Sequence, residues 1–142
     1  MNIRSGAKAL IRRKLDGKYL ILTSSQWEDN PLRSQKPDLP GGRVELGETV
    51  EEGLRRELAE EIGTDLAGTE LQLAYGSTYL NIDDDESVTF MVYFAEVENL
   101  EVKLSWEHES YEWMTAEAVR SLDIREPYPA IFAHFESAGL LG

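Results

Sequence analysis

The sequence has no cysteine among its 142 residues. Disulfide bonds, thiolate metal sites and a cysteine nucleophile are therefore excluded, and the composition is compatible with a reducing compartment. Long apolar runs are also missing, since none approaches the roughly 20 residues that span a bilayer. The N-terminal segment MNIRSGAKALIRRK has basic residues where a signal peptide needs an apolar core. We therefore expect a cytoplasmic protein that does not bind membranes.

Basic residues are scarce, with 14 against 27 acidic ones and a net charge of -13. A wide basic surface for the phosphates of a polymeric nucleic acid is therefore disfavoured. A small polyphosphate can still bind where a divalent cation and a few local Arg or Lys residues reverse the field inside one cleft. The length and the 42% hydrophobic content fit one core, so residues 1–142 are expected to form a single domain.

Two pairs of strands are predicted from apolar and β-branched residues. Segments 6–14 and 18–24 are joined by Asp16-Gly17, a dipeptide typical of a tight hairpin. Segments 70–80 and 87–97 form the second antiparallel pair. The acidic residues between them predict an exposed, solvated turn, with cation binding as the less favoured alternative.

A helix is predicted from Val50 to Ile62, followed by smaller C-terminal elements. Thr49 and Glu52 form a capping box, and Gly63 stands where a left-handed C-cap is expected. Further along, a short strand and two helices are expected at 111–114, 115–122 and 127–137. This order favours an α/β fold, a three-layer α/β/α sandwich with a mixed sheet.

Three carboxylates crowd the C-terminal half of the predicted helix. Glu57, Glu60 and Glu61 fall in one sector roughly 100° wide, with Glu61 at the edge of the core-facing stripe. They repel one another and oppose the helix dipole. Pairing with Arg56 accounts for Glu60 only. A hard divalent cation such as Mg²⁺, held by carboxylates, waters and substrate phosphates, removes the repulsion.

The segment from Gln26 to Gly42 is rich in proline and glycine, which excludes regular structure and predicts a long loop. Gly41 and Gly42 let the backbone approach a metal, so the Gly41 carbonyl can complete the coordination shell. Candidate substrate-binding side chains lie in or beside this loop: Trp27, Arg33, Lys36 and Arg43. A solvated loop with a packed Trp is the alternative.

Residues 42–63, GRVELGETVEEGLRRELAEEIG, resemble the Nudix box, whose fixed positions are mainly glycine, glutamate and arginine. The matching residues are Gly42, Glu48, Arg56, Glu57, Leu58, Glu60, Glu61 and Gly63. The one departure is Thr64 in the final aliphatic position, which affects packing rather than chemistry. Leu39-Pro40-Gly41 and the stretch from Glu107 to Trp113 are similar to the family as well. The resemblance to MutT-like Nudix hydrolases thus covers most of the chain.

This resemblance implies hydrolysis of the pyrophosphate linkage of a nucleoside diphosphate derivative. Mg²⁺, with Mn²⁺ as an alternative, would be bound by Glu57, Glu60, Glu61 and the Gly41 carbonyl. Glu48 and Arg56 would orient these carboxylates. The general base would be Glu57 or, from a later loop, Glu107. No role is assigned to His108.

The resemblance leaves the substrate open. Compact members often convert a nucleoside triphosphate to the monophosphate and pyrophosphate, which is the expected reaction. The ADP-ribose branch usually has a proline after the box, and this chain has none between Pro40 and Pro127. Tyr79 lies just short of the tyrosine of the dinucleoside polyphosphate branch. A nucleotide sugar, and a non-catalytic nucleotide sensor, are further alternatives. The partner is a small nucleotide, and the chain is expected to be a monomer or a homodimer.

Overall fold

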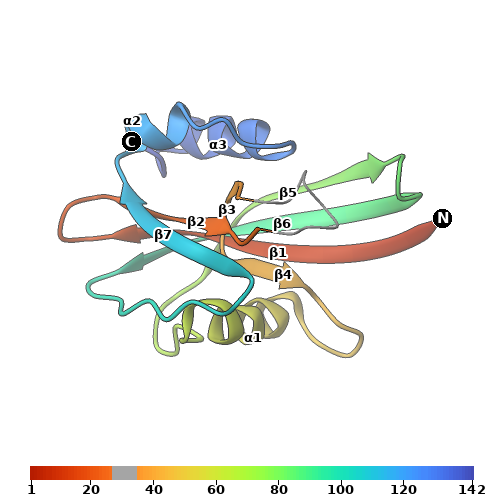
Figure 1. Ribbon diagram of the computed structural model, residues 1–142, viewed down its shortest axis with the longest axis horizontal. Coiled ribbons are helices and arrows are strands. Elements are labelled where there is room, and N and C mark those ends of the chain that lie inside the picture. The colour runs from red at the N-terminus through yellow and green to blue at the C-terminus, as the bar shows by residue number, and fades with distance from the viewer. Residues whose placement is uncertain (27–34) are drawn as a thin grey trace.

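The computed structural model describes residues 1–26 and 35–142, and in these residues the strands form one mixed sheet (Figure 1). The elements are β1 (Asn2–Arg13), β2 (Tyr19–Ser24), β3 (Pro37–Asp38), β4 (Gly41–Arg43), α1 (Val50–Ile62), β5 (Gln72–Asn81), β6 (Glu86–Val97), β7 (His108–Met114), α2 (Ala116–Arg120) and α3 (Tyr128–Ser137). The strand order is β3-β2-β1-β6-β5, with β4 paired to β1 and β7 paired to β2.

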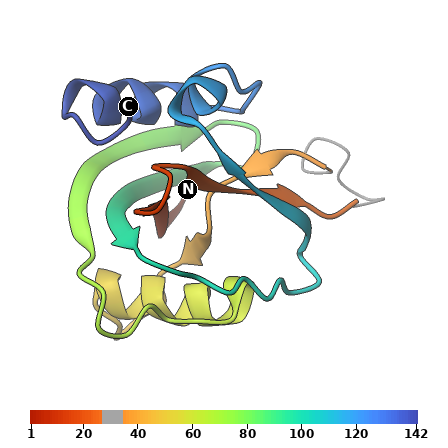
Figure 2. The ribbon, with the colours of Figure 1, turned by 90° about the vertical axis from the view of Figure 1, so that its left-hand side faces the viewer.

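Helices cover both faces of the sheet, with α1 on one side and α2 and α3 on the other (Figure 2). Leu54 and Leu58 of α1 pack with buried side chains of β1 and β2. Phe132 and Phe135 of α3 pack against the opposite face. The predicted α/β/α sandwich is confirmed. No helix among the described residues is long and apolar enough to cross a membrane.

The central strand β1 sets the position of the elements that matter for function. It pairs in parallel with β6 along its whole length, and antiparallel with β4, where Lys8 lies opposite Gly41. Side chains alternate between the two faces of a strand. Ala7 and Ala9 consequently pack in the layer of α1, whereas Leu10 packs in the layer of α3. Lys8 shares a face with Leu10, beside the backbone of β4.

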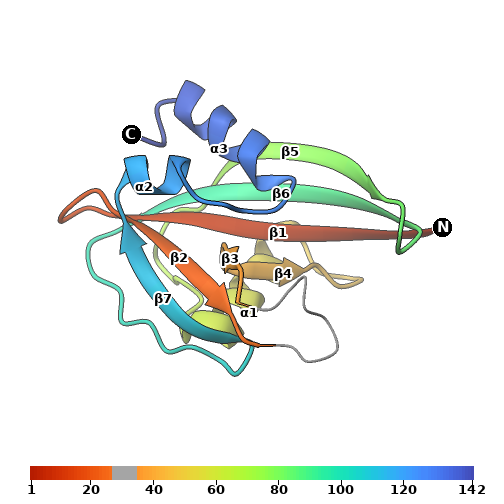
Figure 3. The same cartoon turned by 45° about the horizontal axis from the view of Figure 1, so that its top comes forward.

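The expectation of an irregular segment from Gln26 to Gly42 was wrong in its described part. Two short strands form there, β3 against β2 and β4 against β1. Pro37 is tolerated because β3 lies at the sheet edge. Gly41 has φ of 131°, and a Cβ on it would lie 2.1 Å from the Ala7 carbonyl oxygen, so only glycine fits against β1. Figure 3 shows β4 beside β1 and β7 beside β2.

Helix α1 has the bounds and both caps that the sequence predicts. The side chain of Thr49 accepts a hydrogen bond from the Glu52 amide, and the Glu52 carboxylate accepts one from the Thr49 amide. Gly63 ends the helix with φ of 84°. The β7 strand, by contrast, begins at His108, earlier than expected, because it follows β2 as far as Ser24.

We expect Thr49→Ala to lower the free energy of unfolding by about 1 kcal/mol, because the amide of Glu52 loses its capping acceptor. Urea denaturation measures the change. Thr49→Ser keeps a hydroxyl at the same place, so its free energy of unfolding should be close to that of the parent protein. Equal stability of the Ala and Ser variants would show that the cap contributes nothing.

Candidate active site

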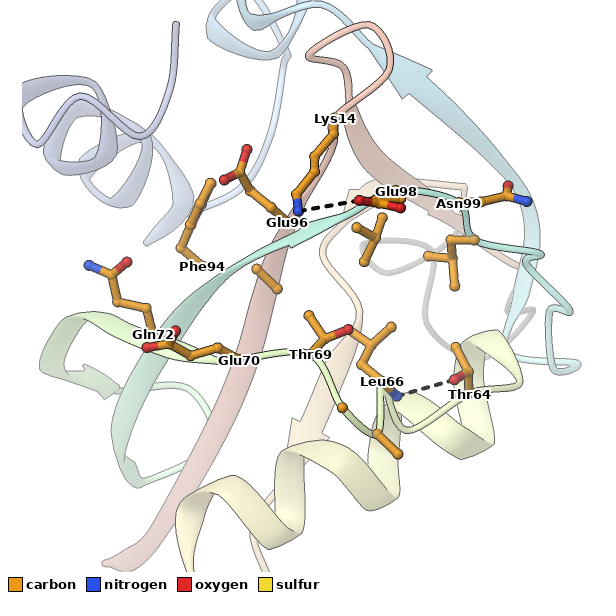
Figure 4. A pocket seen from close by; sticks show the side chains of 15 residues that line it. Lys14, Thr64, Leu66, Thr69, Glu70, Gln72, Phe94, Glu96, Glu98 and Asn99 are labelled. Carbon is orange, nitrogen blue, oxygen red and sulfur yellow. Dashed lines mark hydrogen bonds and ion pairs between the residues drawn. The ribbon is translucent and has the colours of Figure 1, made fainter.

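A cleft of ≈ 1230 Å³ opens on the face of the sheet that carries Lys8. Its walls are the C-terminal half of α1, β4, the β5–β6 hairpin and the segment before α3, and all three helix glutamates line it. A separate cavity of ≈ 700 Å³ lies between the loop after α1 and the end of β6 (Figure 4). Its charged residues are three glutamates and Lys14, whose ammonium points to Glu98 at 3.9 Å. None of the candidate site residues that the structure describes lines that cavity.

Glu61 is buried, with 4% of the residue exposed, and its carboxylate accepts a hydrogen bond of 3.2 Å from the Gly41 amide. Its position at the core edge of the helix is the one that the periodicity predicts. Burial raises the pKa of Glu61 to about 7, although Lys8 and His108 act in the opposite direction. A divalent ion in contact with this carboxylate would favour its ionised form.

Glu57 lies against the second glycine of β4. A Cβ on Gly42 would come within 2.7 Å of the Glu57 carboxylate, so a side chain at that position would displace it. Burial raises the pKa of Glu57, while the neighbouring Arg56 lowers it. Glu60 is the exposed member of the set, with 59% of its side chain accessible. The buried Glu61 and the partly buried Glu57 thus converge on the Gly41-Gly42 backbone.

Arg56 connects the helix carboxylates to the loop before α1. Its guanidinium contacts Glu48 at 2.7 Å, Glu57 at 3.0 Å and Glu60 at 3.4 Å. It also donates to the Arg43 carbonyl at 2.9 Å. The contact with Arg56 lowers the pKa of Glu48. Arg56 thus joins Glu48 to Glu57 and Glu60, and the orienting role of Glu48 and Arg56 stays a prediction.

The donor set fits a hard divalent ion. Among the described residues, no three carboxylate or imidazole side chains already converge closely enough to hold a metal ion by themselves. Mg²⁺ does not need such a cage, because it is usually bound by one or two carboxylates together with waters and substrate phosphates. Glu57, Glu61 and the Gly41 carbonyl provide oxygen ligands of that kind at one end of the cleft.

The remaining predicted residues differ in position. Glu107 and Arg43 line the cleft, and Glu107 is near enough to raise the pKa of Glu57. Lys36 does not belong to the lining, and its backbone bonds to the Ser24 hydroxyl instead. Trp27 and Arg33 lie outside the described residues, so their substrate-binding role stays a prediction.

Comparison with known proteins identifies the family. A family model described as NUDIX domain matches residues 3–135. The chain belongs to the Nudix family. It is 33% identical over 116 residues to the nucleoside triphosphatase NudI of Escherichia coli O139:H28, a match that covers 77% of this chain and 81% of that protein. The protein is therefore a Nudix pyrophosphohydrolase acting on nucleotide derivatives, and such hydrolases generally use divalent metal ions.

Solved structures agree on the Nudix fold. The MutT protein of Methanosarcina mazei Go1 has a TM-score of 0.82 and 27% identity, and the match covers 97% of this chain and 96% of that chain. An Ap4A hydrolase of C. elegans has a TM-score of 0.71 and 22% identity, covering 94% and 98%. The latter likeness shows the fold alone. The Nudix fold therefore does not identify the substrate.

A buried polar network beside the Nudix glutamates was not found from the sequence. Asp38 of β3 accepts hydrogen bonds from Tyr128 at 2.6 Å and Lys8 at 3.4 Å, and Arg125 lies 3.4 Å away. His108 is only 7% exposed and lies 3.7 Å from Asp38 and 4.0 Å from Glu61. The assignment of no role to His108 overlooked this place in the site. The sequence held one signal of this network, because Lys8 is a charged residue within an otherwise apolar strand segment.

The charge of Asp38 depends on its neighbours. Burial by itself would raise the pKa of this carboxyl, but Lys8, His108, Arg125 and Tyr128 together hold the pKa well below its usual range. A lowered pKa in the folded state stabilises the protein above the unfolded pKa of about 3.9, and this stabilisation is lost as the pH falls further. Folding therefore favours the ionised form of Asp38.

We expect Asp38→Asn to lower the free energy of unfolding at pH 7 by about 3 kcal/mol, because Lys8 and Arg125 lose a buried counter-charge. The difference from the parent protein should shrink below about pH 4, because the unfolded parent then binds a proton at Asp38 that the folded parent does not bind. Denaturation between pH 3 and pH 8 measures both effects.

The exposed residue Asp123 provides the control, since Asp123→Asn should change stability by less than about 0.5 kcal/mol. A deficit of Asp38→Asn that stays constant down to pH 3 would contradict the assignment.

Proposed function

We propose that the protein hydrolyses a nucleoside triphosphate to the nucleoside monophosphate and pyrophosphate, with Mg²⁺ as its cofactor and Mn²⁺ as an alternative ion. The observation that supports this reaction best is the convergence of Glu57 and Glu61 on the Gly41-Gly42 backbone at one end of the cleft. In a chain of net charge -13, this cleft also has more acidic than basic side chains in its lining, and a bound divalent ion would offset the excess. Its basic side chains are Arg4, Lys8, Arg43 and Arg125. Cations of this kind attract phosphate groups.

Each residue of the proposed site has a separate role in the reaction. Glu57, Glu60, Glu61 and the Gly41 carbonyl would hold the ion. When bound, it would neutralise charge that develops on the phosphate oxygens and make a nearby water more acidic. Arg56, anchored by Glu48, keeps the Glu57 carboxylate in place. Arg43, which lines the cleft, binds the phosphates.

Glu57 is the proposed general base, which accepts the proton of the water that attacks phosphorus. Burial raises the pKa of Glu57, and a raised pKa makes a carboxylate a better proton acceptor near neutral pH. Glu107 lines the same cleft and is the alternative base.

The triphosphate substrate is favoured by the relative NudI, whose name describes a nucleoside triphosphatase. Tyr79 lines the cleft, and this position favours a dinucleoside polyphosphate as the second candidate. A sensor that binds a nucleotide without turnover is disfavoured. A sensor would have no need of a buried and a partly buried carboxylate beside a glycine pair, where each costs desolvation energy.

We expect a panel of nucleoside triphosphates, dinucleoside polyphosphates, nucleotide sugars and ADP-ribose to be turned over selectively, with the triphosphates fastest. The products should be the monophosphate and pyrophosphate, detected by chromatography and a pyrophosphate assay. EDTA should abolish turnover, and Mg²⁺ should restore it. Tight binding of one member with no turnover of any would instead support the sensor.

We expect Glu57→Gln and Glu61→Gln to lower kcat by at least about 100-fold, because each removes a ligand of the ion and Glu57→Gln also removes the base. Both variants should keep the parent far-UV circular dichroism spectrum. Steady-state kinetics with the best substrate of the panel measures the loss.

Glu51→Gln is the matched control, since Glu51 is an exposed glutamate of the same helix and should leave kcat unchanged. Glu107→Gln should lower kcat by a smaller factor than Glu57→Gln does. The reverse order would assign the base to Glu107, and a near-normal rate in either helix variant would refute the scheme.

A further inference from the structure

Lys8 meets the backbone of β4 at the metal end of the cleft. Its ammonium group donates a hydrogen bond of 3.0 Å to the Gly41 carbonyl oxygen and lies 3.4 Å from the Asp38 carboxylate. The side chain is 11% exposed. A Cβ on Gly41 would lie 2.7 Å from the Lys8 Cα, so the two backbones are in close contact. Pairing of β1 with β4 therefore fixes the position of Lys8 relative to the Gly41 carbonyl.

The carbonyl that Lys8 contacts is the proposed backbone ligand of the divalent ion. Mg²⁺ binds oxygen at about 2.1 Å. An ion on the Gly41 carbonyl would consequently lie within about 5 Å of the Lys8 ammonium, given the 3.0 Å hydrogen bond. The two cations repel each other, and burial of Lys8 limits the screening of this repulsion by water.

We propose that the Lys8 ammonium is a resident cation on the Gly41 carbonyl, which competes with the incoming divalent ion and so sets the metal affinity of the enzyme. This inference rests on the proposed function, because it takes Gly41 as a metal ligand. Lys8 acts through Gly41 and touches no reacting atom, so it is a positioning residue. It belongs to β1, outside the segment that resembles the Nudix box.

The neighbours of Lys8 explain why its ammonium lies on the Gly41 carbonyl and how it can leave that carbonyl when a metal ion binds. Without metal, Lys8 donates to the Gly41 carbonyl and lies beside Asp38, and its positive charge also acts on Glu61. When the ion arrives, Asp38 remains within reach of the ammonium. The ammonium can leave the carbonyl for the carboxylate without becoming unpaired. The carbonyl is thereby held in place in the metal-free enzyme, at a cost in metal affinity.

The test is the dissociation constant of Mg²⁺ for the full chain without nucleotide, measured by isothermal titration calorimetry after removal of metal with EDTA. Lys8→Gln removes the charge but keeps an amide donor for the Gly41 carbonyl. We expect Mg²⁺ to bind on the order of tenfold more tightly to Lys8→Gln, and Lys8→Arg to resemble the parent. The rise of Tm on addition of Mg²⁺ should be larger for Lys8→Gln, which gives a second readout.

Lys14→Met is the matched control. Lys14 follows β1, is 51% exposed and lines the other cavity, so this variant removes the same charge far from the glycine pair. Its Mg²⁺ affinity should equal that of the parent. If the parent and Lys14→Met bind Mg²⁺ and Lys8→Gln binds it equally or more weakly, the competition is overturned while the proposed function stands. If neither the parent nor Lys8→Gln binds Mg²⁺, both proposals fail.

Discussion

The contact between the Glu61 carboxylate and the Gly41 amide is the constraint on which the site depends. It joins the end of α1 to β4, and β4 is held by the register of β1. A side chain on either glycine would break the arrangement, because one would strike the backbone of β1 and the other the Glu57 carboxylate. The glycine pair therefore allows α1 to bury the Glu61 carboxylate against β4.

Acidic side chains outnumber basic ones in the lining of the cleft, so an anionic substrate needs a counter-charge there. The proposed divalent ion would supply that charge, together with the basic side chains of the cleft. Lys8 compensates the negative charge of Asp38 and Glu61, and it also lines the cleft. The network around Asp38 holds β1, β3 and the start of α3 together behind the metal end.

Local signals predicted the helix and its glutamates, and non-local pairing decided what surrounds them. The bounds of α1 followed from Thr49 and Gly63, whose capping roles depend on neighbouring residues only. The short strands β3 and β4 have too few residues for a periodic pattern, so they could not be distinguished from a loop. Lys8 and Asp38 are 30 residues apart, and only the register of the sheet brings them together. The buried place of His108 depends on the same register.

In our proposal the helix carboxylates and the Gly41 carbonyl form one site for a divalent ion. Anomalous diffraction from crystals grown with Mn²⁺ would locate this ion without reference to activity. We expect a peak at bonding distance, roughly 2.2 Å, from the Gly41 carbonyl oxygen and from Glu57 or Glu61. A peak only at the acidic turn between β5 and β6, or none at the glycine pair, would contradict it.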